Sequence, residues 1–135
     1  MSDEKAQARV EFAFLADAAE PGLHGKVSAL GIGINKIFAS SFPAVHQTLA
    51  LVYRLSIPVD DTATTVKVEF GSAHGGLARI LVEQPMPDLA RQTGHHVGVL
   101  NIVGLEFPEP GQYVFTISLG DQDAAVLNLE AGLRD

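Results

Sequence analysis

Hydrophobic and polar residues alternate along most of this chain. Successive side chains of a strand point to opposite faces, so a period of two predicts strands. The apolar rows are Val10, Phe12, Phe14 and Ala16; Leu49, Leu51, Tyr53, Leu55 and Ile57; Val66, Val68 and Phe70; Tyr113, Phe115, Ile117 and Leu119; and Ala125, Leu127 and Leu129. We therefore expect Phe14, Leu51, Val68 and Phe115 to be buried, and Glu11, Lys67 and Glu69 to be exposed.

The segments between these rows complete the predicted fold. Residues 27–34 and 97–107 are apolar on both faces, which is typical of central strands. Residues 77–84 fit a short strand better than a helix, and residues 85–96 have room for a short helical turn. Gly- and Pro-containing turns separate about eight strands. We expect an all-β protein, an antiparallel β-sandwich in one domain at residues 9–132, after a flexible N-terminus at residues 1–8.

Composition and charge exclude several classes of function. The 135 residues suffice for a single core, and the net charge of −7 disfavours phosphate backbones and anionic lipid heads. The absence of cysteine excludes disulfides, thiolate metal sites and cysteine nucleophiles. No apolar run is long enough for a membrane span or the core of a signal peptide. The sequence predicts a cytoplasmic protein that binds no nucleic acid and inserts into no membrane.

The sequence contains no recognisable catalytic constellation. It has no Gly-x-Ser-x-Gly motif, and its Gly31-x-Gly33 pair lacks the third glycine, helix and downstream acid of a dinucleotide site. Its five histidines include the adjacent pair His95 and His96, which would point to opposite faces of a strand and so could not both bind one metal ion. We expect no enzyme activity and no cofactor.

Acidic loops form the first candidate site. If consecutive strands run antiparallel, the loops at residues 19–25, 58–63, 85–95 and 120–123 share one end of the sandwich. Calcium takes six to eight oxygen ligands, and clustered carboxylates supply them. The candidate ligands are Asp60, Asp61, Asp121 and Asp123. The alternative is that these carboxylates are ordinary solvated loop residues.

Apolar segments form the second candidate site. Ile37, Phe38 and Phe42 lie in a connection, where a chain usually turns polar. They belong either to a strand that crosses between the sheets, which we favour, or to an exposed interaction patch. The strand at residues 124–130 ends the chain and is expected to lie at a sheet edge, with unpaired backbone groups. We expect self-association or docking on a larger protein through one of these two elements.

Three segments in order carry a resemblance to a known family: FLADAA at residues 14–19, LGIGINKIF at 30–38 and PGQYVFTI at 110–117. Together they resemble a bacterial family of small proteins, the domain of unknown function family 6941, over about residues 10–129. The resemblance implies a β-sandwich and brings no catalytic residues. In the third segment, Pro110-Gly111 predicts a tight turn, after which the Tyr113 hydroxyl is placed to bond backbone at the corner of the sandwich.

These observations favour a non-catalytic β-sandwich that acts through protein contacts, as an adaptor or as a component of an assembly. Its partner would be a different protein or another copy of the chain. The alternative is a module that uses the acidic loop end to bind an ion or a small ligand, either calcium or a sugar.

Overall fold

The computed structural model describes residues 7–58, 65–75 and 78–134. Most of the expected flexible N-terminus, residues 1–8, lies outside this part of the chain. The elements are β1 (Arg9–Ala16), β2 (Ala18–Pro21), the 3-10 turn η1 (Leu23–Gly25), β3 (Val27–Leu30), β4 (Lys36–Ala39), β5 (Ala44–Ser56), β6 (Thr65–Ser72), β7 (Ala78–Pro85), α1 (Asp88–Thr93), β8 (His95–Phe107), β9 (Gly111–Leu119) and β10 (Gln122–Leu133).

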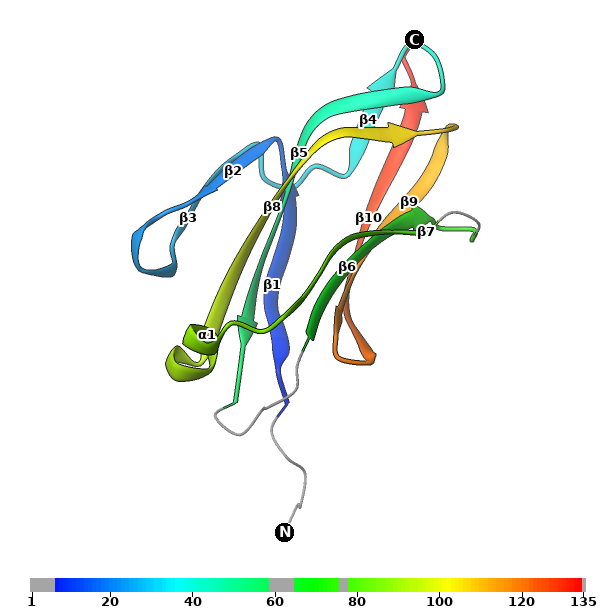
Figure 1. Ribbon diagram of the computed structural model, residues 1–135. Helices are drawn as coiled ribbons and strands as arrows, with labels where there is room; N and C mark the ends of the chain where they lie inside the picture. The colour runs from blue at the N-terminus through cyan, green and yellow to red at the C-terminus, as the bar shows by residue number, and fades with distance from the viewer. Residues whose placement is uncertain (1–6, 59–64, 76–77, 135) are drawn as a thin grey trace.

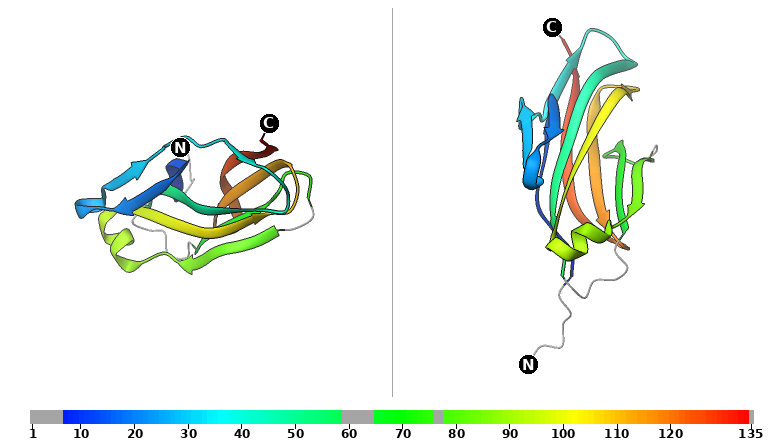
Figure 2. Two further views of the ribbon diagram at one scale, coloured as in Figure 1. Left: turned by 90° about the horizontal axis from the view of Figure 1, so that it is seen from above. Right: turned by 60° about the vertical axis from the view of Figure 1, so that its left-hand side comes forward.

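Two larger sheets face each other as the layers of a sandwich (Figures 1 and 2). The three-stranded sheet has the order β1-β5-β8, and the five-stranded sheet has the order β4-β10-β9-β6-β7. Their paired strands are antiparallel, except that β4 runs parallel to β10. The hairpin of β2 and β3 lies on the side of the three-stranded sheet that faces away from the five-stranded sheet (Figure 2, right). The prediction of an all-β sandwich is confirmed.

The described residues form ten strands rather than about eight. One of the two further strands is β4, which contains Ile37 and Phe38 and is the crossing strand that the sequence favoured; the other is β2. Each has four residues, which is too short for an alternating pattern to stand out. The predictions of a strand near residues 77–84 and of a helical turn before His95 are confirmed by β7 and α1.

The prediction of a central strand at residues 27–34 is wrong. Only Val27–Leu30 form a strand, and this strand pairs with β2 alone in the small hairpin. Gly31 and Gly33 follow with positive φ values of 69° and 95°, which end the extended conformation. Leu30 is 74% exposed, so this apolar run lies at the surface.

The core lies between the two larger sheets. Leu51, Val68 and Phe115 are fully buried, as the alternation predicts. Glu11 is exposed, as predicted, whereas Lys67 and Glu69 are only partly exposed and form an ion pair of 3.2 Å. The largest fully buried side chains are Phe107, Phe115, Leu49, Leu51, Leu55, Leu105, Ile117 and Leu129.

The predicted burial of Phe14 is wrong, because a bulge reverses the faces of β1. Val10 pairs with Leu55 and Phe12 pairs with Arg54, so Glu11 is an extra residue in the ladder. One inserted residue moves every later side chain to the opposite face. Leu15 is consequently buried, while Phe12 and Phe14 stack on the outer face with their ring centroids 6.0 Å apart.

Four aromatic rings close one region of the core. Phe70 stacks on Tyr113 at 5.5 Å and meets the edge of Phe107 at 5.4 Å and the tilted ring of Phe115 at 4.8 Å. The Tyr113 hydroxyl donates a hydrogen bond of 2.6 Å to the backbone carbonyl of Glu109. This bond confirms the expected role of Tyr113 at the corner before β9.

Two predictions about strand position are also wrong. β8 was expected to be central, but it pairs only with β5 among the described residues and therefore lies at a sheet edge. β10 was expected to be an edge strand, but it lies between β4 and β9. Within the described part of the chain, no helix has the length and apolar character needed to cross a membrane.

Candidate functional site

The three apolar interaction candidates do not form one surface patch. β4 crosses to the five-stranded sheet, which is the interpretation that the sequence favoured. Within β4, Ile37 points into the core, whereas Phe38 is 54% exposed and lies 5.1 Å beneath the Lys36 ammonium group. Phe42 is partly buried and packs against the core. Of the three, only Phe38 presents most of its side chain at the surface.

The two larger sheets end in four edge strands, β1, β8, β4 and β7, which differ in how they are protected against pairing with another strand. β1 carries the bulge and the charge of Glu11, and β4 has only four residues. β7 carries Arg79 and Glu83 and ends at Pro85. Charges, bulges, short strands and proline are the usual means of preventing another strand from pairing with an edge. β8 has 13 residues, contains Glu106 as its single Asp, Glu, Lys or Arg residue, and exposes 80% of Val103. It is the least protected of the four.

The acidic candidates are only partly within the described residues. Asp60 and Asp61 lie outside them. Asp121 is exposed in the turn between β9 and β10, which lies toward the same end of the molecule as α1 (Figure 1). The Asp123 Oδ1 atom accepts a hydrogen bond of 3.0 Å from the buried Ser118 hydroxyl, so this carboxylate satisfies a core hydroxyl group. No cluster of three or more metal-binding side chains occurs among the residues that the structure describes.

His95 and His96 lie on opposite faces of β8, as expected. His95 pairs with Ser56 and points outward, while His96 pairs with the buried Leu55 and points inward. The two imidazoles therefore belong to different environments. His95 takes part in a surface cluster, and His96 is held at the margin of the core.

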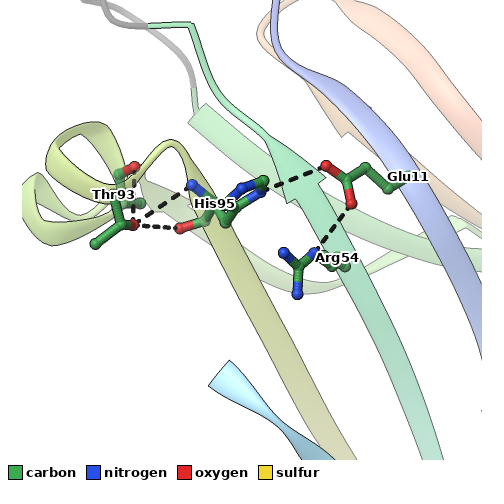
Figure 3. Close-up of polar contacts among 5 residues, drawn as sticks. Glu11, Arg54, Thr93 and His95 are labelled. Carbon is green, nitrogen blue, oxygen red and sulfur yellow. Dashed lines mark hydrogen bonds and ion pairs between the residues drawn. The ribbon is translucent and has the colours of Figure 1, made fainter. Parts of the chain in front are cut away.

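The surface cluster joins the N-terminal part of β1 to the C-terminal end of β5 and the start of β8 (Figure 3). The Glu11 carboxylate accepts a hydrogen bond of 3.0 Å from Arg54 Nε, and its other oxygen lies 3.4 Å from His95 Nδ1. The Thr93 hydroxyl accepts a hydrogen bond of 3.4 Å from the His95 backbone N–H. This bond ties the turn after α1 to the start of β8. The register of Arg9 with Ser56 and Val10 with Leu55 carries Glu11 to the position of Arg54, and the bulge leaves Phe12 as the residue paired with Arg54.

A groove of about 710 Å³ lies beside this cluster. The segment around η1 and the segment of α1 line it, together with Arg54 and the first residues of β8. The lining residues are Pro21, Gly22, His24, Gly25, Lys26, Arg54, Pro87, Leu89, Ala90, Thr93, His95, His96 and Val97. The lining residues with polar side chains on the outer side of β8 are His24, Lys26, Arg54, Thr93 and His95; His96 also borders the groove, but its imidazole points to the inner face. His24 has a φ of 59°, a left-handed conformation that non-glycine residues rarely adopt.

No motif in the sequence marks Glu11, Lys26 or Arg54 as site residues. One signal was present, because Arg54 is the only charged residue in β5. Its partner Glu11 follows only from the register of β1 with β5.

The His96 imidazole lies beside the ring of Tyr53 at the margin of the core. Its ring lies 6.2 Å from the ring of Tyr53, and its buried Nε2 atom has no hydrogen-bond partner among the described residues. Burial lowers the pKa of the His96 imidazole and raises the pKa of the Tyr53 hydroxyl. Both groups therefore favour their neutral forms.

We expect His96 to make the fold sensitive to acid. Because its folded pKa lies below the usual 6.5, the unfolded chain binds this proton more tightly, and stability falls as the pH drops below that value. Urea unfolding at about pH 7.5 and about pH 5.5 measures the loss. His96→Leu should lose less stability than the wild type over this interval. His74→Leu, in an exposed turn, is the matched control. An undiminished loss in His96→Leu would contradict the assignment.

One protein-family model matches most of this chain. The model of a family described as a family of unknown function (DUF6941) matches residues 11–131. The chain belongs to the DUF6941 family. The resemblance noted in the sequence is thereby confirmed, and the match to DUF6941 spans Glu11, Arg54 and His95. A comparison with curated proteins finds no match.

Proposed function

We propose that this protein is a non-catalytic adaptor or assembly component, and that the open edge of β8 is its contact surface. The observation that carries the proposal is the 13-residue length of this edge strand, with only one charged residue. Unpaired N–H and C=O groups along such an edge can pair with an extended segment of another chain. The occupant we propose is a strand from another protein chain, either a partner or a second copy.

The exposed side chains of β8 support this proposal. Val103 is 80% exposed, although valine is typical of half-buried strands. The inner face of the same strand is anchored in the core by the buried Leu105 and Phe107. Gly104, with a φ of 70°, interrupts the extended conformation after Val103, so the regular part of the edge that a partner strand would meet is residues 95–103. Because this part is already ordered, a partner strand meets a preformed template, which lowers the entropic cost of pairing.

Sedimentation equilibrium at micromolar concentration tests association between copies. We expect the wild type to associate and Val103→Lys to weaken association by about tenfold or more, because a lysine on the edge opposes strand pairing. The matched control is Val126→Lys, the same change at a valine of β10 that is 52% exposed. Equal weakening by both variants would argue against β8. A monomer at every concentration would refute pairing between copies and leave a different protein as the strand donor.

A further inference from the structure

The groove beside Glu11 collects cationic and imidazole side chains in an otherwise acidic chain. The protein has nine Lys and Arg residues against sixteen Asp and Glu. Yet the described lining of the groove contains Lys26, Arg54, His24 and His95, and none of the described lining residues is acidic. Its local charge is therefore opposite in sign to the net charge. A concave surface lined by one sign of charge attracts ligands of the other sign.

The donors in the groove suit an anion with oxygen atoms. Arg54 uses its Nε for Glu11, so a ligand would meet the two terminal Nη groups of the guanidinium. A planar guanidinium pairs well with carboxylate oxygens. Lys26, between η1 and β3, is a second cationic residue in the lining. The Glu11 side chain is an example of a carboxylate bound by these groups, since it contacts both Arg54 and His95.

The remaining lining is apolar. Pro21 lies on the η1 side, while Pro87 and Leu89 lie on the α1 side, and Leu89 is 68% exposed. A volume of about 710 Å³ falls within the range of about 300–1,000 Å³ that is typical of small-molecule sites. The walls thus suit a ligand with an apolar body next to its anionic group.

We propose that this groove binds a small organic acid, a carboxylate attached to an apolar body. Arg54 and Lys26 bind the carboxylate, and the apolar body packs between the two proline-bearing walls. Glu11 holds Arg54 in place from the side of β1 and competes with the ligand for its charge. The groove shares His95, His96 and Val97 with the start of β8, but the proposed carboxylate binding does not depend on association of the protein.

Titration of the ¹⁵N-labelled protein followed by NMR tests this proposal, with phenylacetate as the probe and neutral phenylacetamide as its uncharged control. We expect saturable shifts from phenylacetate in residues 21–26, 54 and 87–97, and none of comparable size from phenylacetamide. Inorganic phosphate tests whether any anion suffices. Phosphate binding as tight as that of phenylacetate would overturn the role of the apolar walls. Equal shifts from acid and amide, or shifts scattered over the molecule, would overturn the site itself.

Three variants separate binding from folding. Lys26→Gln should weaken phenylacetate binding about fivefold or more, whereas Lys36→Gln, a lysine of β4 paired with Glu130, should leave it unchanged. Glu11→Gln should tighten binding severalfold, because it removes the carboxylate that competes for Arg54. A merely structural role of Glu11 would give the opposite sign. Weaker binding in Glu11→Gln, or equal effects of the two lysine variants, would refute the proposal.

Discussion

Phe115→Ala lowers the free energy of unfolding by about 3–5 kcal/mol, a large part of the stability of a domain of this size. Phe115 is fully buried, and its ring lies 4.8 Å from Phe70 in the aromatic cluster. Truncation to alanine removes buried apolar surface and leaves a cavity among rings that are held from both sheets. Urea unfolding with matched slopes for wild type and variant measures the loss.

Phe38→Ala is the control for this prediction, since it makes the same chemical change at a side chain that is 54% exposed. Its ring contacts Lys36 at the surface, so we expect a loss much smaller than that of Phe115→Ala. Similar losses from the two variants would mean that the packing between the sheets differs from that described above.

Gly98→Ala destabilises the protein by about 1–3 kcal/mol or more, because the new methyl group has no room. A Cβ atom at this position would overlap the ring of Tyr53, the residue paired with Gly98 across β5 and β8. Tyr53 is only 3% exposed, so its ring cannot move into solvent. Thermal and urea unfolding both measure the effect.

Gly132→Ala is the matched control for Gly98→Ala. Gly132 also lies in a strand, but a Cβ there would meet only the flexible Lys36 side chain at 3.8 Å, an ordinary contact distance. We expect this variant to be neutral or slightly more stable, since glycine costs about 0.5–1 kcal/mol relative to alanine inside a strand. If Gly98→Ala left the stability as unchanged as Gly132→Ala does, the described close contact between Gly98 and the Tyr53 ring would be incorrect.

The sequence predicted the proposed contact surface on β8 only in part. The apolar character of β8 was visible, but its position at an edge was not. Apolar residues on both faces of a strand report that both faces are covered, and they say nothing about backbone pairing. In β8 the core covers the inner face, while β2 contacts the strand from the hairpin side. Side-chain cover and edge pairing are independent, so the prediction of a central strand was wrong.

The position of β10 in its sheet likewise could not be predicted from the local sequence pattern. As the last strand of the chain, it was expected to lie at an edge. The short β4 instead crosses between the sheets and pairs in parallel with the final residues of β10, from Glu130 to Leu133. Neighbours in a sheet are chosen by packing over the whole domain, whereas alternation is a local property of each strand.

By itself, the sequence determined the all-β class and the buried faces of β5, β6 and β9, because alternation along a strand directly states which side is apolar. Tertiary structure decided the face of β1, since a single extra residue at Glu11 reverses every side chain after it. The register of β1 with β5 sets Glu11 beside Arg54, and pairing of β8 with β5 brings His95 beside them. Residues 11, 54 and 95 lie far apart in the chain, and only the registers of two strand pairs bring them together.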